Sequence, residues 1–196
     1  MNEDEKGLLH LLALDQCQHF PCLVQNYQHL LYAFTWRLTG NAQDAEDLLQ
    51  EAFLGIYTTL ACYSPERIQM LKLRPWLYKI TLNVFRNSKR GQHLNLLSLD
   101  QDESAQIPAL SSDGPEWRYE TLEQFQELEH LLWRLPEQYR VVVICYFFEQ
   151  LTYQEIADLL DQPLGTVKSR LHRGLHLLRT RQGIQAEERN YANGAY

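Results

Sequence analysis

Apolar residues recur along most of the chain at the spacing of amphipathic α-helices, and no segment alternates apolar and polar residues as a half-buried strand would. The first apolar face predicts a helix that stops at Gly40, because glycine often ends helices. Its inward residues are Leu23, Val24, Tyr27, Leu30, Leu31, Phe34 and Leu38. Asn41 then suits the N-cap of a second helix. The inward residues of this second helix are Ala45, Leu48, Leu49, Ala52, Phe53, Ile56, Tyr57 and Leu60.

A third helix is predicted from Pro75 to about Arg90, just before Gly91. Periodicity then fails from residue 98 to about 117 and resumes from about 120 to 181. The chain is therefore predicted to be all-α, with two small helical domains joined by a flexible acidic linker. The expected divisions are an N-terminal extension (1–22), a first domain (23–95), the linker (96–120), a second domain (121–183) and a loosely ordered tail (184–196).

Charge is distributed unevenly along the 196 residues. The total of 18 Lys and Arg against 25 Asp and Glu gives a formal net charge of -7, which taken alone argues against a nucleic-acid partner. Residues 163–183, however, contain five basic residues and no acidic one, whereas residues 98–126 contain seven acidic residues and one basic one. This segregation indicates function more than solubility.

Composition narrows the class of protein. A hydrophobic content of 45% is typical of a globular chain. The longest apolar run, residues 141–148, is far shorter than the roughly 20 residues of a membrane span, so no membrane insertion is expected. The acidic start of the chain does not resemble a secretory signal, and four cysteines are too few for a disulfide framework. We therefore expect a cytoplasmic location.

The C-terminal half contains a helix-turn-helix pattern. Thr152 and Glu155 have the spacing of a capping box, and a short helix after them should bury Ile156, Ala157, Leu159 and Leu160. Residues 161–165 break this helix, and a second one is predicted from Thr166. Helix, tight turn and helix is the layout of a DNA-reading module.

The second helix of this pattern has two contrasting faces. Its apolar face, which should pack on the first helix, comprises Val167, Leu171, Gly174, Leu175 and Leu178. Its polar face comprises Thr166, Ser169, Arg170, Arg173 and His176, with Lys168 and His172 on the flank. Short polar and cationic side chains without carboxylates suit contacts with base edges and phosphates. The simpler interpretation is a solvated basic face. His172 and His176 have metal-pair spacing, but no carboxylate or cysteine is nearby, so no metal is expected.

The second helix of the N-terminal half presents acidic and amide groups opposite its apolar face. These are Asp44, Asp47, Gln50 and Glu51, and Leu54 and Thr58 extend the same face. Such a face is most often simply solvated. An exposed leucine within an acidic stripe favours instead a surface that docks a basic protein helix.

The third helix carries a stripe of cations, an amide and an aromatic ring: Trp76, Lys79, Asn83, Arg86 and Arg90. The opposite, buried face comprises Leu77, Ile80, Thr81 and Val84. A third sector, Tyr78, Leu82 and Phe85, either packs on a neighbouring helix or is available for base stacking. Cations interleaved with aromatic rings suit single-stranded or opened DNA. The alternative is an amphipathic helix with incidental basic residues.

Taken together, these segments resemble a bacterial RNA polymerase sigma factor of the extracytoplasmic-function (sigma-70 family) type. Residues 41–53 resemble the region-two signature, and residues 74–83 resemble the segment that follows it. Residues 135–140, 151–157 and 163–173 resemble region four. The resemblance covers roughly residues 23–95 and 121–181.

The resemblance implies partners and roles. Asp47, Gln50 and Glu51 would contact the β′ clamp helices of core RNA polymerase. Lys79, Asn83 and Arg86 would hold the minus-ten strand of promoter DNA. The minus-thirty-five duplex would be held by Thr166, Lys168, Ser169, Arg170 and Arg173. The acidic linker would run near the path of nascent RNA, and an anti-sigma factor is implied as a further partner. Neither a cofactor nor catalytic chemistry is implied.

Two features depart from the family pattern. The N-terminal extension is rather apolar through Leu8, Leu9, Leu11, Leu12 and Leu14, and we expect it to pack on region two rather than bind a partner. The end of the third helix, residues 85–90, is less typical of the segment that melts DNA. Neither feature reveals the promoter sequence or the inducing signal.

Two other functions remain open at this point. One is a helix-turn-helix regulator that acts without polymerase, with an N-terminal sensing or dimerisation domain. The other is an enzyme or sensor that uses a metal near the N-terminus, where His10, Cys17, His19 and Cys22 are irregularly spaced. The sequence shows neither a nucleophile with a paired base nor a phosphate-binding loop, either of which would support an enzyme.

Overall fold

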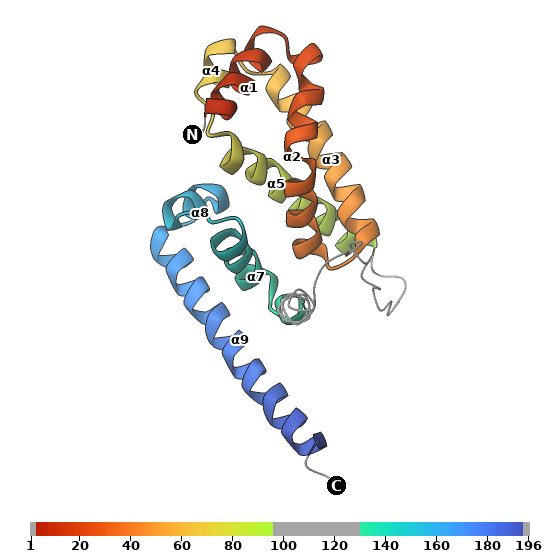
Figure 1. Cartoon of the computed structure of the whole chain (residues 1–196), viewed down its shortest axis with the longest axis vertical. Coiled ribbons are helices and arrows are strands. Elements are labelled where there is room, and N and C mark those ends of the chain that lie inside the picture. The colour runs from red at the N-terminus through yellow and green to blue at the C-terminus, as the bar shows by residue number, and fades with distance from the viewer. Residues whose placement is uncertain (1–2, 96–129, 194–196) are drawn as a thin grey trace, which may run out of the picture. The chain divides into compact units, whose positions relative to one another are not determined.

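The computed structural model describes the backbone of residues 3–95 and 130–193 and the side chains of residues 4–89 and 130–180. These parts are helical and contain no strand, which confirms the all-α prediction (Figure 1). The chain divides into two compact units, residues 1–107 and 108–196. The predicted acidic linker, residues 96–120, lies outside the described residues. Within the described parts, no helix is both long and apolar enough to cross a membrane.

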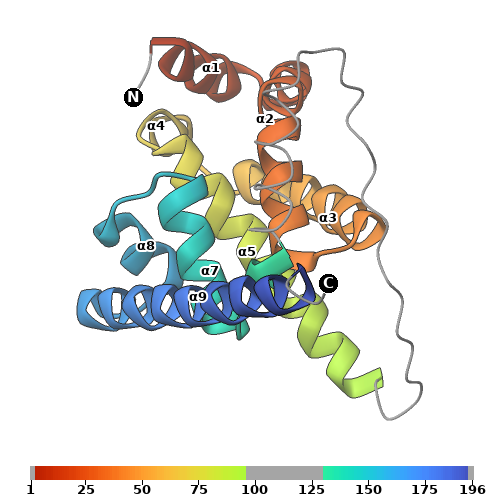
Figure 2. The same cartoon turned by 60° about the horizontal axis from the view of Figure 1, so that its bottom comes forward.

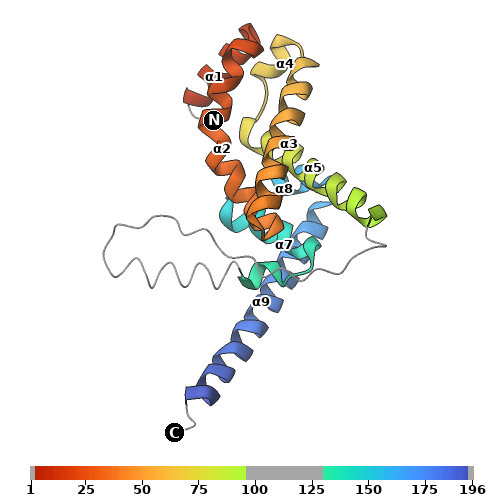
Figure 3. The same cartoon turned by 90° about the vertical axis from the view of Figure 1, so that its right-hand side faces the viewer.

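Unit 1 is a helical bundle in its described part. Its helices are α1 (Glu3–Leu14), α2 (Gln16–Thr39), α3 (Ala42–Ala61), α4 (Pro65–Gln69) and α5 (Leu73–Asn95). Helix α3 packs along both α2 and α5, and α1 packs against α2 and α4 (Figures 1 and 3). The predicted inward faces form the core, where Leu31, Phe34, Ile56, Leu77 and Leu82 are fully buried.

The junction between α2 and α3 follows from two residues that the sequence singled out. Gly40 takes a left-handed conformation (φ 77°), and its N–H donates to the carbonyl of Trp36 at 2.8 Å. The Asn41 side chain accepts the N–H groups of Gln43 and Asp44 at 2.8 and 3.2 Å. The helix stop and the N-cap are both confirmed.

Helix α5 is longer than predicted at both ends. It begins at Leu73 rather than Pro75 and continues through Gly91 to Asn95, so the predicted stop was wrong. Glycine inside a helix costs only about 1 kcal/mol relative to alanine, which the rest of the helix can absorb. Gly91 lies inside α5, whereas Gly40 takes the left-handed conformation that makes it a helix stop.

The N-terminal extension is packed, as we expected. Leu8, Leu9 and Leu12 of α1 are at most 6% exposed. Asp15 then caps α2 by accepting the N–H of Gln18 at 3.0 Å. Helix α2 thus begins at Gln16, ahead of the apolar face that predicted it.

Unit 2 places a helix-turn-helix on a short supporting helix. After a helical segment at residues 130–133, its elements are α7 (Glu137–Val143), the π-helical η1 (Ile144–Phe148), α8 (Tyr153–Leu160) and α9 (Leu164–Asn193). Helix α9 packs on α7 and α8, and Figure 2 shows its length. It starts two residues before the predicted Thr166 and extends past the predicted end at Arg181. The tail to Asn193 is therefore helical, contrary to our expectation of loose order.

Two residues, Gly174 and Arg140, each join neighbouring segments of unit 2. Gly174 of α9 is buried against α7, where an added Cβ would lie 3.0 Å from Val143 Cγ2. Arg140 of α7 donates through Nη1 to the carbonyl oxygen of Trp133 at 3.3 Å. Burial lowers the pKa of the Arg140 guanidinium below its usual value. This arginine therefore joins two segments of the unit.

Candidate functional site

The helix-turn-helix begins with the predicted capping box. Thr152 Oγ1 accepts the N–H of Glu155 at 3.2 Å, and Glu155 Oε2 accepts the N–H of Thr152 at 2.9 Å. The helix α8 that follows buries its four predicted apolar residues and ends at Leu160, with the left-handed Asp161 (φ 52°) as its C-cap. Three residues, 161–163, form the turn to α9.

The face of α9 that we predicted to bind DNA is largely open to solvent. Lys168, Ser169, Arg173 and His176 are exposed. Thr166 and Arg170 are half-buried. On the opposite side, Val167, Leu171 and Leu178 are buried, as the apolar pattern predicted. The helix therefore presents a basic surface on one side while the other side fixes it to the unit.

An aromatic pair borders this basic surface and was not singled out from the sequence. The rings of Tyr146 and Tyr153 stack with centroids 5.0 Å apart, and Lys168 Nζ lies 5.8 Å from the Tyr153 ring centroid. A side-chain hydrogen bond with Tyr146 raises the pKa of the Tyr153 phenol. The two tyrosines are seven residues apart on different elements, a spacing that gave no sequence signal.

The stripe along α5 combines exposed and half-buried side chains. Asn83 is exposed, whereas Trp76, Lys79 and Arg86 are half-buried. The side chain of Arg90 lies outside the described residues. The stripe thus has the accessibility that a nucleic-acid contact requires over its described length.

Trp76 belongs to a cluster that the sequence did not reveal. Its Nε1 donates to the hydroxyl of Tyr63 at 3.4 Å, and the two ring centroids are 6.1 Å apart. The guanidinium carbon of Arg67 lies 3.8 Å from the Tyr63 ring centroid. We call Tyr63, Arg67 and Trp76 the Trp76 platform, because they place two flat rings and a cation at the start of the α5 stripe.

The third sector of α5 packs inside unit 1. Tyr78, Leu82 and Phe85 are at most 1% exposed, and the Tyr78 ring centroid lies 4.8 Å from that of Phe34. Of the two alternatives that the sequence left open, packing is correct and base stacking by these residues is excluded. This sector is buried because both α2 and α3 contact α5.

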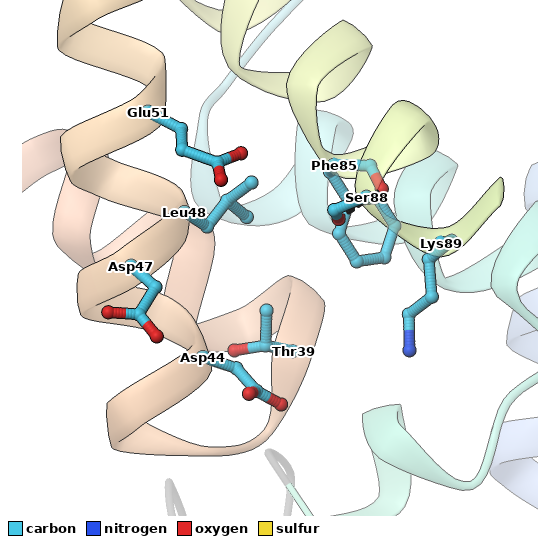
Figure 4. Close-up of a pocket in the computed structure, with 8 residues that line it drawn as sticks. All are labelled: Thr39, Asp44, Asp47, Leu48, Glu51, Phe85, Ser88 and Lys89. Atoms are coloured by element: carbon cyan, nitrogen blue, oxygen red, sulfur yellow. Dashed lines mark hydrogen bonds between the residues drawn. The ribbon is translucent and has the colours of Figure 1, made fainter. Parts of the chain in front are cut away.

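The acidic face of α3 is exposed and borders a pocket. Asp44, Asp47, Gln50 and Glu51 are exposed, and Leu54 is 67% exposed in their midst. Figure 4 shows the open pocket of about 190 Å³ that lies between α3 and α5. Its lining residues are Thr39, Asp44, Asp47, Leu48, Glu51, Phe85, Ser88 and Lys89.

The pocket has acidic groups on one side and almost fully buried apolar side chains between its two helices. In Figure 4, Leu48 and Phe85 lie between α3 and α5, with the carboxylates on the α3 side. Lys89 stands across from them, with Nζ 5.9 Å from the Phe85 ring centroid.

The cysteines and histidines near the N-terminus do not form a metal centre in the described structure. No group of three or more His, Cys, Asp or Glu in the described parts could hold a metal ion. Cys17 instead lies against α3, with Sγ 3.1 Å from the hydroxyl of Tyr57. Cys22 is an exposed, free thiol.

Comparison with known families identifies the class of protein. The model described as sigma-70 region 2 matches residues 23–94, and the model described as sigma-70 region 4 matches residues 125–178. The chain is 31% identical to the ECF RNA polymerase sigma factor SigW of Bacillus subtilis over 166 residues, which are 82% of this chain and 87% of that protein. The chain belongs to the extracytoplasmic-function (ECF) sigma factors of the sigma-70 family.

Two further relatives agree with this membership. The chain is 34% identical to SigE of Mycolicibacterium smegmatis over 80% of this chain and 59% of that protein. It is 30% identical to the sigma-E factor of Escherichia coli K12 over 79% of this chain and 81% of that protein. Both relatives carry the name ECF RNA polymerase sigma factor.

Two solved structures share the fold. One is RpoE in complex with the anti-sigma factor NepR from Bartonella quintana, with a TM-score of 0.64 and 22% identity, covering 82% of this chain and 94% of that chain. The other is CnrH in complex with the cytosolic domain of CnrY, with a TM-score of 0.64 and 18% identity, covering 93% of this chain and 99% of that chain.

Proposed function

We propose that the protein binds core RNA polymerase and directs it to promoters by recognising minus-ten and minus-thirty-five elements. The observation that carries this proposal is that both sigma-70 regions match in order on one chain. Exposed polar and charged side chains lie on the helices to which the two promoter contacts and the polymerase contact are assigned. The chemistry of RNA synthesis belongs to polymerase, so we assign this protein no catalytic group. Its place of action is accordingly the cytoplasm, where bacterial polymerase meets its template.

The acidic face of α3 is proposed as the polymerase-docking surface. Asp44, Asp47, Gln50 and Glu51 would pair with basic side chains of the β′ clamp helices, and Leu54 would contact apolar surface between them. Charged side chains give such an interface its orientation and rate of encounter, while apolar contact contributes to its affinity. The pocket beside Glu51 supports this role because Asp44, Asp47 and Glu51 line it together.

The α5 stripe is proposed to hold the opened minus-ten strand. Lys79, Arg86 and Arg90 would neutralise phosphates, Asn83 would hydrogen-bond a base edge, and Trp76 would stack on a base. The contacts of Trp76 extend this set to Tyr63 and Arg67, which lie on the same platform.

The exposed face of α9 is proposed to enter the major groove of the minus-thirty-five duplex. Its set is Thr166, Lys168, Ser169, Arg170, Arg173 and His176. Recognition helices contact bases through their N-terminal turns, and these residues begin at the third residue of α9. The packing of Val167 and Leu171 against the unit supports the proposal, because it fixes which face is presented.

We also propose the domain limits and a regulatory partner. Residues 23–95 and 121–183 would act as the two binding domains, with residues 96–120 as the acidic connector between them. An anti-sigma factor is proposed as a partner, in line with the complex in which the related RpoE was solved.

Reconstitution with core polymerase and a promoter library tests the proposal directly. We expect a stable complex and transcripts that start at a small set of promoters sharing two spaced elements. If the protein does not associate with core polymerase, the proposal is wrong. Specific binding of a palindromic duplex by the free protein, with no effect on transcript starts, would favour the polymerase-independent regulator instead.

A further inference from the structure

Helix α4 depends on another helix for its position. It has five residues, far fewer than an isolated helix needs to be stable in water. Ser64 caps it by accepting the N–H of Arg67 at 3.3 Å, and Ile68 is its one buried residue, at 4% exposed. The most extensive contact of α4 is with α1. Helix α1 is therefore its main support.

Helix α1 is itself firmly held. Leu8, Leu9 and Leu12 are buried, and the hydroxyl of Tyr27 on α2 donates to Glu5 Oε1 at 3.2 Å. Figures 1 and 2 show α1 beside both α2 and α4. The sigma-70 region 2 model begins at residue 23, so α1 lies outside the part of the chain that the model matches. This helix thus links α4 to α2.

The position of α4 determines the geometry of the Trp76 platform. Arg67 belongs to α4 and covers the ring of Tyr63 at 3.8 Å, and Tyr63 accepts the hydrogen bond from Trp76 at 3.4 Å. If α4 moves, the Arg67 guanidinium leaves the Tyr63 ring. The Tyr63 ring then loses this contact, and Tyr63 is the residue that accepts the hydrogen bond of Trp76.

We propose that α1 is a positioning element for promoter opening: by holding α4, it fixes the Trp76 platform in the orientation that captures an unstacked base. This inference rests on the proposed function of the α5 stripe. The carboxylates of the polymerase-docking surface are remote from the platform, because even Glu51 lies ten residues before Ala61, the end of α3, which is roughly 15 Å of helix. Substitutions that loosen the packing of α1 should therefore slow promoter opening without weakening the binding of core polymerase.

Three matched substitutions in the full-length protein test the inference. Leu9→Ala and Leu12→Ala remove buried side chains of α1, whereas Leu11→Ala removes the same atoms from a residue that is 39% exposed. Each variant is assembled with core polymerase, and permanganate reactivity of minus-ten thymines measures the opened fraction over time. We expect the buried variants to open the promoter about tenfold more slowly, within the range for loss of one base-stacking contact. The affinities for core polymerase and for a minus-thirty-five duplex should not change.

A second readout separates positioning from general damage. Hydrogen exchange at residues 63–70 should become faster in Leu9→Ala and Leu12→Ala but not in Leu11→Ala. Ile68→Ala, made from the α4 side, should reproduce the opening defect, and the double variant Leu12→Ala/Ile68→Ala should lose less than the sum of the two. Should the alanine variants of α1 also lose polymerase binding, Tyr27→Phe, which deletes only the hydroxyl bonded to Glu5, provides the milder variant for the same measurements.

The outcomes separate this inference from the function on which it rests. Faster hydrogen exchange in α4 with an unchanged rate of promoter opening would overturn the proposed role of α1. An equal defect in promoter opening in Leu11→Ala would overturn it too. If the unaltered protein bound polymerase but opened no promoter, the proposed function would fail instead. The exchange contrast would in that case still report whether α1 holds α4.

Discussion

Gly174 shows how a single residue fixes the approach of two helices. An added Cβ would meet Val143 Cγ2 at 3.0 Å and Tyr139 Cβ at 3.4 Å. Gly174→Ala should therefore lower the free energy of unfolding of unit 2 by about 1–3 kcal/mol, the usual cost of overpacking. Chemical denaturation measures the change. Gly165→Ala in the same helix is the control, because its Cβ would meet nothing within 4 Å; an equal loss there would contradict the explanation.

Gln150 is strained by its backbone conformation. Its φ of 55° lies in the left-handed region, which costs a non-glycine residue roughly 1–2 kcal/mol. Gln150→Gly should raise the free energy of unfolding by about 1 kcal/mol, since part of this relief is offset by the greater freedom of glycine in the unfolded chain. Gln150→Ala keeps the strain and should give no gain. Thermal unfolding of the two variants distinguishes strain from a lost side-chain contact.

At the residue scale, the sequence predicted what depends on near neighbours along the chain. The N-cap at Asn41 and the capping box from Thr152 to Glu155 each involve residues within three positions, and both are present. The contact of Trp76 with Tyr63 crosses thirteen residues and a separate helix. Periodicity cannot predict such a contact, because it depends on how α4 is held rather than on the spacing of the residues.

At the scale of helices, the contact between α1 and α2 should weaken at alkaline pH, because it includes the hydrogen bond from Tyr27 of α2 to Glu5 of α1. Burial, together with the nearby Glu5 carboxylate, raises the pKa of the Tyr27 phenol from 10.0 to about 12. The folded state therefore favours the neutral phenol, and this stabilisation is complete below pH 10 and is lost as pH rises through 12. The maximum effect is about 3 kcal/mol, from two pKa units. Tyr27→Phe should show a shallower fall in unfolding free energy between pH 10 and 12; identical profiles would contradict this assignment.

For α9, the proposed recognition helix, substitutions should separate base reading from phosphate binding. Arg173 lies on the exposed face with Ser169, whereas Lys168 lies toward Tyr153 on the flank. We expect Arg173→Ala to cost about 1–3 kcal/mol and to relax preference at one promoter position. Lys168→Ala should weaken binding to all sequences and reduce the salt slope by about 1. Binding to a library of minus-thirty-five duplexes at several salt concentrations measures both, and a uniform loss for Arg173→Ala would assign it to phosphate.

The extent of the helices was the least predictable feature at the element scale. The stop at Gly40 was correct, and the stop at Gly91 was wrong, although both positions carry glycine. The difference is conformational: Gly40 adopts the left-handed geometry that lets its N–H bond back to Trp36. Sequence alone indicates that a glycine can end a helix, but the packing around it decides whether it does.

Across the whole molecule, the net charge of -7 misrepresents the partners that the surfaces fit. Acidic residues gather on α3, and basic residues gather on α5 and α9, so that each helix presents its own sign of charge. The segment charges could be read from the sequence, and the resemblance correctly identified the chain as a sigma factor. What the sequence could not give is the half-burial of Lys79 and Arg86, because this depends on the neighbours of α5 in the folded unit.

This distribution leads to a prediction in which two binding measurements change in opposite directions. Asp47→Asn and Glu51→Gln together remove two negative charges without adding a cation. The free protein should therefore bind nonspecific duplex DNA slightly more tightly, because its overall repulsion from phosphate falls. The salt slope of that binding should not change, since it counts the cations that contact phosphates.

With core polymerase present, the same double variant should lose affinity for the enzyme and start fewer transcripts. The reason is that the removed carboxylates are those assigned to the docking surface, where charge pairing increases the association rate and favours the correct partner. Filter binding of duplex DNA by the free protein and run-off transcription with polymerase measure the two effects. Ser169→Ala, on α9, serves as the matched control: it should leave polymerase affinity unchanged. If the double variant lost affinity for both duplex DNA and polymerase, the fold of unit 1 would be damaged. If it gained affinity for both, α3 would not be part of the polymerase interface.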